Sequence, residues 1–140
     1  MCFRRRFKKA LNTTVAAGSK ELVLDLEERC CVRQLVLGVD MDDSTGTNQS
    51  RWIIKVDEDE VLNESIANMY FHLSGYGANS AASRYFNATQ YTDNYKNYTF
   101  VILDLGRVDR RLAIFFKNKD TSNPATVHCG VIYDILEDEK

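Results

Sequence analysis

Alternation of apolar and polar residues with a period of two is the feature that most constrains how this chain can fold. Successive side chains of a strand point to opposite faces of a sheet, so this period indicates half-buried strands. Six segments of the 140-residue sequence have strand character, one of which (98–105) is apolar on both faces, as in a central strand. They are Lys20–Leu26, Val32–Val39, Arg51–Asp57, Tyr98–Leu105, Arg111–Lys117 and Ala125–Leu136.

The alternation also predicts which side chains form the core. Turn-forming residues separate the segments at Asp43–Gly46, Gly106–Asp109 and Asn118–Pro124. We therefore expect an all-β fold, an antiparallel β-sandwich, with a closed barrel as the alternative. The side chains expected to point inward are Leu22, Leu24, Leu26, Leu35, Leu37, Val39, Trp52, Ile54, Val56, Leu112, Ile114, Phe116, Val127, Cys129, Val131, Tyr133 and Ile135.

One stretch departs from the period of two. Glu58–Leu73 has apolar residues at roughly helical spacing, namely Val61, Leu62, Ile66, Met69, Tyr70 and Leu73. Asp57 or Asp59 could cap a helix in this stretch. We expect one short helix here. Two strands are the alternative interpretation of the same residues.

The bases of the N-terminus form a separate feature. The first acid of the chain is Glu21, and removing five N-terminal bases from the 18 Lys and Arg leaves 13 against 20 acids. The sequence therefore divides into a basic N-terminal arm, 1–19, of charge +5 and a single domain, 20–140, of charge −7. Such an arm is too polar to fold alone, so its own body, a neighbouring copy or an acidic partner must hold it. The bases are Arg4, Arg5, Arg6, Lys8 and Lys9.

The arm predicts docking onto another protein. Binding to nucleic acid is a weaker alternative because the body is acidic and the sequence pI is about 5.7, and a merely solvated arm is a third. The acidic run Glu137–Glu139 is a candidate receptor for the arm of a neighbouring copy. No apolar run approaches the length of a membrane span, so we expect no membrane partner.

A second candidate surface lies in the segment 74–97, which is rich in tyrosine and small polar residues. This composition is typical of recognition surfaces, and we expect a binding or subunit-contact loop with one short strand near Arg84–Thr89. The alternative is that half of the rings are core residues. The candidate recognition residues are Tyr76, Tyr85, Phe86, Tyr91 and Tyr95.

Known catalytic and metal-binding patterns do not match this sequence. Asp40, Asp42 and Asp43 resemble a calcium loop superficially, but the glycine and glutamate positions of that loop do not fit, so a polar hairpin is the preferred interpretation. His128 and Cys129 are adjacent and face opposite ways on a strand. We expect reduced, mostly buried cysteines, no catalytic residue, no metal and no cofactor.

The order of these segments resembles viral structural proteins of the jelly-roll or β-sandwich type. A basic arm precedes Val15–Leu26, which looks like the first strand of small virion and tail-associated domains, and Arg111–Lys119 followed by Ala125–Tyr133 looks like the last strands. The resemblance implies a jelly-roll-like, non-enzymatic virion component that is made in the host cytoplasm. It would decorate a capsid, occupy a vertex or join head and tail, with other virion proteins and further copies of itself as partners.

Two other classes of function fit the same residues. A carbohydrate- or receptor-binding β-sandwich would use the tyrosine-rich loop, 76–98, because aromatic rings stack on sugars. A small cellular scaffold would be monomeric and would not need residues 1–9.

Overall fold

The computed structural model describes residues 3–70, 86–90 and 96–136. All six segments predicted as strands are strands, and the short strand expected within 74–97 is present as well. The elements are β1 (Phe3–Val15), β2 (Lys20–Leu26), β3 (Cys30–Met41), α1 (Ser44–Gln49), β4 (Arg51–Val56), β5 (Asp59–Ser65), α2 (Ile66–Asn68), β6 (Phe86–Gln90), β7 (Asn97–Val108), β8 (Leu112–Lys117) and β9 (Ala125–Leu136).

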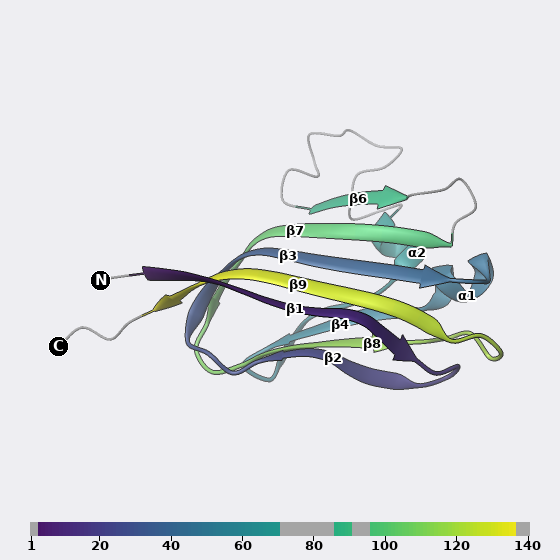
Figure 1. The fold of residues 1–140 in the computed structure, drawn as a ribbon, viewed down its shortest axis with the longest axis horizontal. Helices are drawn as coiled ribbons and strands as arrows, with labels where there is room; N and C mark the ends of the chain where they lie inside the picture. Colours follow the sequence, from purple (N-terminus) through teal and green to yellow (C-terminus); the bar gives the residue numbers. More distant parts are fainter. Residues whose placement is uncertain (1–2, 71–85, 91–95, 137–140) are drawn as a thin grey trace.

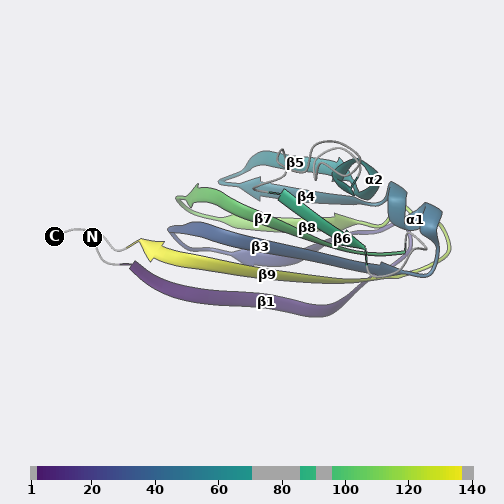
Figure 2. The same cartoon turned by 90° about the horizontal axis from the view of Figure 1, so that it is seen from above.

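The strands form two antiparallel sheets that pack face to face (Figures 1 and 2). One sheet has the order β1-β9-β3-β7-β6 and the other the order β2-β8-β4-β5. If β6 is set aside, the remaining strands form two four-stranded sheets, and the chain changes sheet at every connection except β4–β5. This double-sheet arrangement is jelly-roll-like. It confirms the predicted all-β sandwich.

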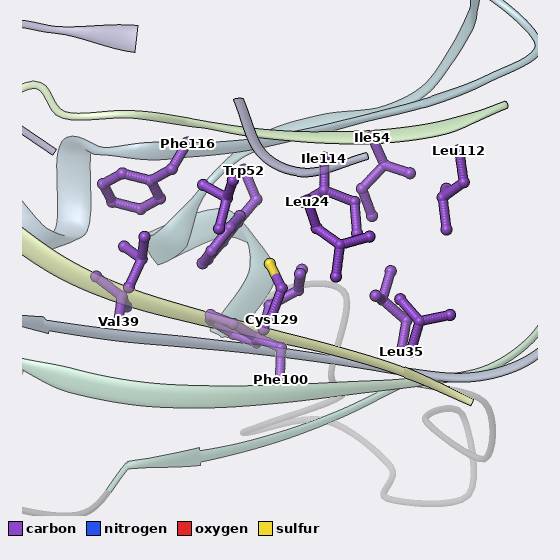
Figure 3. Packing of buried hydrophobic residues seen from close by; sticks show 14 of the residues in the cluster. Leu24, Leu35, Val39, Trp52, Ile54, Phe100, Leu112, Ile114, Phe116 and Cys129 are labelled. Carbon is purple, nitrogen blue, oxygen red and sulfur yellow. The ribbon is translucent and has the colours of Figure 1, made fainter. Parts of the chain in front are cut away.

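The core lies between the two sheets. Side chains of β4 and β8, including Trp52 and Phe116, meet side chains of β3, β7 and β9, including Phe100 (Figure 3). The rings of Trp52 and Phe116 meet edge to face with centroids 4.9 Å apart, an arrangement that aromatic quadrupoles favour. Leu35, Leu37 and Val39 of β3 are buried as the alternation predicts.

The predicted face of β2 is wrong at Leu22. The pairing of β2 with β8 shifts register between Leu22 and Leu24, which marks a β-bulge. A bulge inserts one residue and reverses the alternation locally. Val23 is therefore buried beside Leu24, while Leu22 is exposed.

The short helix expected in Glu58–Leu73 is present as α2, but its predicted start and its N-cap at Asp57 or Asp59 are wrong, since the N-cap is Ser65. Most of the first half of this stretch is strand β5, and only the short α2 is helical. Asp57 and Glu58 both have positive φ, 50° and 72°, as the tight turn of a β-hairpin requires. The carboxylate of Asp57 joins that turn to the β7–β8 connection, because it accepts hydrogen bonds from the backbone amides of 109–111.

A helix, by contrast, begins where a turn was expected at Asp43–Gly46. Asp43 is the N-cap of α1, and its carboxylate accepts a hydrogen bond from the amide of Thr45. Gly46 lies so close to Asp120 that a Cβ at this position would be 2.4 Å from a carboxylate oxygen. Only glycine fits at this contact between the helix and the β8–β9 connection.

The N-terminal residues do not form an arm apart from the body. Residues 3–15 are β1, which pairs with β9 from Phe3 opposite Leu136 to Val15 opposite Ala125. Of the three alternatives, the body of the same chain holds these residues. Their order comes from backbone hydrogen bonds to β9, which do not require burial of the side chains. The expected boundary at residue 19 falls in the turn between β1 and β2.

Candidate interaction surface

The predicted basic residues all lie on one strand at the edge of the larger sheet. Within the described part of the chain, β1 pairs on one side only, with β9, and it forms the outer margin of the sandwich in Figure 2. Residues 4–9 are all exposed. The structure therefore gathers the bases into a row along a rigid edge.

A buried carboxylate fixes the start of β1. Asp134 of β9 accepts hydrogen bonds from Arg5 at 2.9 and 3.1 Å and from Nε of Arg33 at 2.8 Å. Its side chain is 8% exposed, whereas those of Arg5 and Arg33 are 58% and 45% exposed. The hydrogen bonds from Arg5 and then Arg33 lower the pKa of Asp134 to about 2. This Arg5–Asp134–Arg33 clamp joins β1, β9 and β3.

Lys8 holds the middle of β1 from its inner side. Its ammonium group donates a hydrogen bond to the backbone carbonyl of Asp25 on β2. Beside it opens a pocket of about 520 Å³ whose lining includes Glu27 and Glu28 as well as Tyr133. The inner side of β1 therefore combines a fixed lysine with an acidic wall.

The outer side of β1 carries two exposed apolar side chains. Phe7 is 73% and Leu11 57% exposed. Phe7 lies opposite Ile132 of β9, and Lys9 lies opposite Gly130. We call this surface the β1 face; it comprises Phe7, Lys9, Leu11, Val36, His128 and Ile132.

A hollow adjoins Leu11 on the β1 face. It has a volume of about 360 Å³, and Gly38 and Gly130, which have no side chain, lie in its floor. Nδ1 of His128 accepts a hydrogen bond of 3.0 Å from the amide of Asn12, which holds the imidazole ring at the hollow. A second hollow of about 210 Å³ continues from Gly38 and His128 towards Asp40. The surface thus offers exposed apolar side chains and concave space side by side.

The predicted aromatic surface is only partly described. Tyr76, Tyr85, Tyr91 and Tyr95 lie outside the described residues. Phe86 packs against the core, with its ring centroid 6.0 Å from that of Phe100. This places Phe86 at the margin of the core and not on an exposed recognition loop, because β6 pairs with β7 and presents Phe86 to the inner face.

Asp40 and Asp43, which were considered for metal binding, have structural partners. Asp40 accepts a hydrogen bond from the side-chain Nδ2 of Asn97, and Asp43 caps α1. Burial raises the pKa of the Cys30 thiol to about 12 and also raises that of Cys129, so both thiols stay protonated. Both are buried, as predicted.

The described ranges contain neither a metal-binding cluster nor a membrane-spanning helix. No group of three His, Cys, Asp or Glu side chains there is arranged to hold a metal ion. No helix in the described part of the chain is long and apolar enough to cross a membrane.

Sequence reasoning identified the bases but missed the β1 face. Because 1–19 has no strand period in the sequence, the sequence does not place Phe7 and Leu11 together on one face of a strand. A signal existed in Gly38 and Gly130, which interrupt two strongly apolar strands. A glycine inside a strand often marks a close approach by another group.

Comparisons with known proteins identify a fold and no family. No protein-family model and no curated protein matches this chain. The crystal structure of dimeric latent PorU from Porphyromonas gingivalis matches with a TM-score of 0.51 and 5% sequence identity. The match covers 96% of this chain and 13% of that chain. At this identity the likeness concerns the fold alone.

Proposed function

We propose that this protein is a non-enzymatic structural component of a larger assembly and that it associates with further copies of itself through the β1 face. The observation that carries the proposal is the exposure of Phe7 and Leu11 beside an apolar hollow. The outer face of a sandwich strand is normally polar, and contiguous exposed apolar surface is typical of an interaction site.

The geometry of the β1 face supports contact between identical copies. Exposed apolar side chains and a hollow on one face are the two parts of a self-complementary surface. In a two-fold contact, a residue of one copy fills a site on the second copy, and the reverse contact forms by symmetry. Phe7 is the natural side chain to enter the hollow beside Gly38.

We further propose that the assembly is a viral particle. The support is the resemblance of the chain to jelly-roll virion proteins, in which it would act as a capsid-decorating, vertex or head–tail component. Jelly-roll sandwiches also occur in lectin domains, and a fold does not determine a function. The carbohydrate-binding alternative depends on loop residues that lie outside the described structure.

The test is the mass of the full chain in solution. Light scattering and sedimentation over a range of protein concentration should show a reversible oligomer. Salt should strengthen it, because the β1 strands of both copies are basic and salt screens their repulsion. The double variant Phe7→Ser/Leu11→Ser should stay monomeric at concentrations where the unchanged protein associates.

The matched control is Val61→Ser, which removes a similarly exposed apolar side chain from β5 of the other sheet. This variant should associate as the unchanged protein does. A monomer at every concentration, or equal association of both variants, would refute self-association through the β1 face. The viral proposal predicts that the protein sediments with particles in a density gradient. Protein that remains in the soluble fraction contradicts it.

A further inference from the structure

We propose that the outer edge of β1, from Phe3 to Ala10, binds an acidic, extended segment of a partner protein as an additional strand of the five-stranded sheet. This inference rests on the proposed assembly role, because it names a second class of partner for β1. The β1 face would contact another copy, whereas the edge would bind a different protein.

The backbone of β1 is suited to strand addition. In an antiparallel pair, every other residue directs its N–H and C=O away from its partner, so part of the β1 backbone faces outward beyond β9. The stretch from Phe3 to Ala10 pairs with β9 without interruption. The register shifts after Ala10, and Asn12 has a φ of 54°. This irregularity ends the straight part of the edge at Ala10.

The edge is also held in place before any partner arrives. The Arg5–Asp134–Arg33 clamp fixes the start of β1, and the hydrogen bond from Lys8 to β2 fixes its middle. A preorganised strand loses little conformational freedom on binding. Such an edge is a typical acceptor for an extended peptide.

The side chains of the edge specify the chemistry of the partner. Arg5, Phe7 and Lys9 share the outer face, and the alternate positions 4, 6 and 8 carry bases on the inner face. Cross-strand neighbours of opposite charge stabilise a pair of strands, and an aromatic ring favours an apolar neighbour. The complementary strand therefore carries carboxylates on its outer face, beside Arg5 and Lys9, and a large apolar side chain between them opposite Phe7.

Charge disfavours two other occupants of this edge. A second β1 strand would place Arg and Lys against Arg and Lys, which destabilises pairing. A nucleic acid would bring phosphates near Glu27 and Glu28, which line the pocket beside Lys8, and the whole chain has a net charge of −2. A short acidic strand can bind along β1 without reaching that acidic wall.

The test uses the full chain, labelled with ¹⁵N, and a synthetic acidic peptide of alternating glutamate and valine with a central phenylalanine. Two further peptides carry N-methyl groups on alternate residues, either the odd or the even ones. Each methylated peptide lacks the N–H donors of one edge and keeps the same charge. Binding is measured by fluorescence anisotropy, and amide shifts locate the site.

We expect the amide shifts to concentrate in β1 between Phe3 and Ala10 and the affinity to fall with added salt. One methylated peptide should bind at least about tenfold more weakly than the other, because several backbone hydrogen bonds are lost together. Arg6→Glu/Lys9→Glu should weaken binding strongly. The matched control Lys119→Glu changes an exposed base in the β8–β9 connection and should leave binding unchanged.

Equal binding of the two methylated peptides would overturn strand addition, because charge attraction by itself would then explain the binding. Equal binding of a single-stranded oligonucleotide of the same charge would overturn the preference for protein. Shifts away from β1, or no binding, would refute the site. These outcomes are distinct from failure of the assembly proposal. Peptide binding to the edge does not depend on self-association, and the effect of Phe7→Ser/Leu11→Ser on the oligomeric state is measured without the peptide.

Discussion

β1 and β3 lie on the two sides of β9 and differ in how deeply their side chains are buried. They have similar lengths, 13 and 12 residues, and both pair antiparallel with β9 along nearly all of it. Val32, Leu35, Leu37 and Val39 of β3 are buried, whereas among residues 4–15 of β1 only Val15 is fully buried in the core. The same pairing partner therefore does not give two strands the same environment.

The difference comes from what lies beyond the shared partner. β3 has β7 on its other side and is in the middle of the sheet, where the second sheet covers its inner face (Figures 1 and 2). β1 ends the sheet, so its backbone is paired on one side and its side chains reach solvent. A strand at a sheet edge is held by its backbone, and a central strand is held mainly by apolar burial.

The largest expected effect compares two leucines. Leu37→Ala removes a fully buried side chain of β3 and should lower the free energy of unfolding by about 2 to 5 kcal/mol. Leu11→Ala removes an exposed side chain of β1 and should change it by less than about 0.5 kcal/mol. Urea denaturation measures both. Similar losses for the two variants would show that β1 is buried as deeply as β3.

The Arg5–Asp134–Arg33 clamp links side chains of β1 and β3 through Asp134 of β9. The pKa of Asp134, about 2, lies below the ordinary value of 3.8. Asp134 therefore takes up a proton at a higher pH in the unfolded chain than in the folded protein. The clamp therefore stabilises the fold above about pH 4, and this contribution is lost as the pH falls from about 4 to about 2.

Asp134→Asn should lower the melting temperature at pH 7, and the deficit should shrink as the pH falls through that window. The control Asp109→Asn disrupts an ion pair with Arg107 in which both side chains are more than half exposed, and it should have little effect at any pH. A deficit for Asp134→Asn that stays constant from pH 7 to pH 2 would contradict the ionic role of the clamp.

A smaller effect is expected at Gly38, where β3 contributes to the β1 face. A Cβ there would be 3.4 Å from Cδ2 of His128, a tight contact that a small shift of the ring relieves. Gly38→Ala should raise the free energy of unfolding by up to about 1 kcal/mol, because alanine loses less backbone entropy than glycine. The same methyl group should weaken self-association by filling the hollow. Denaturation and light scattering on one sample check both results.

The smallest effect on stability is expected for the bases of the edge. Arg6→Ser/Lys9→Ser should change the free energy of unfolding by less than about 0.5 kcal/mol, because both side chains are exposed. The variant should nevertheless aggregate faster on storage, since charges on an edge strand prevent indiscriminate pairing. Turbidity over time measures the rate of aggregation, and an unchanged rate would contradict a protective role of these bases.

The strands that the sequence predicts correctly are those in which buried apolar residues recur at every second position. β3, β8 and β9 place apolar residues at every second position because one face of each lies against the core. The prediction failed where burial is not repeated. β5 lies at the edge of the smaller sheet with Val61 exposed, so its few apolar residues fell at helical spacing by chance.

The candidate surface shows the same division. The cluster of bases in β1 is visible in the sequence. Its arrangement along a sheet edge depends on pairing with β9, which lies more than a hundred residues further along the chain. The hollow of the β1 face requires Gly38 and Gly130 to lie on neighbouring strands. Phe86 was expected on a recognition loop, and its pairing with β7 turned it towards the core.

The sequence by itself determined the fold class, the central strands, most of the core and the asymmetry of charge. These properties follow from the residue types and from a period that needs no knowledge of distant partners. Only the tertiary structure decided that the basic segment is a strand, which of its sides is open and where the apolar surface lies. An edge strand is stabilised by backbone hydrogen bonds to a distant strand, and such bonds are nearly independent of side-chain identity and leave little pattern in the sequence.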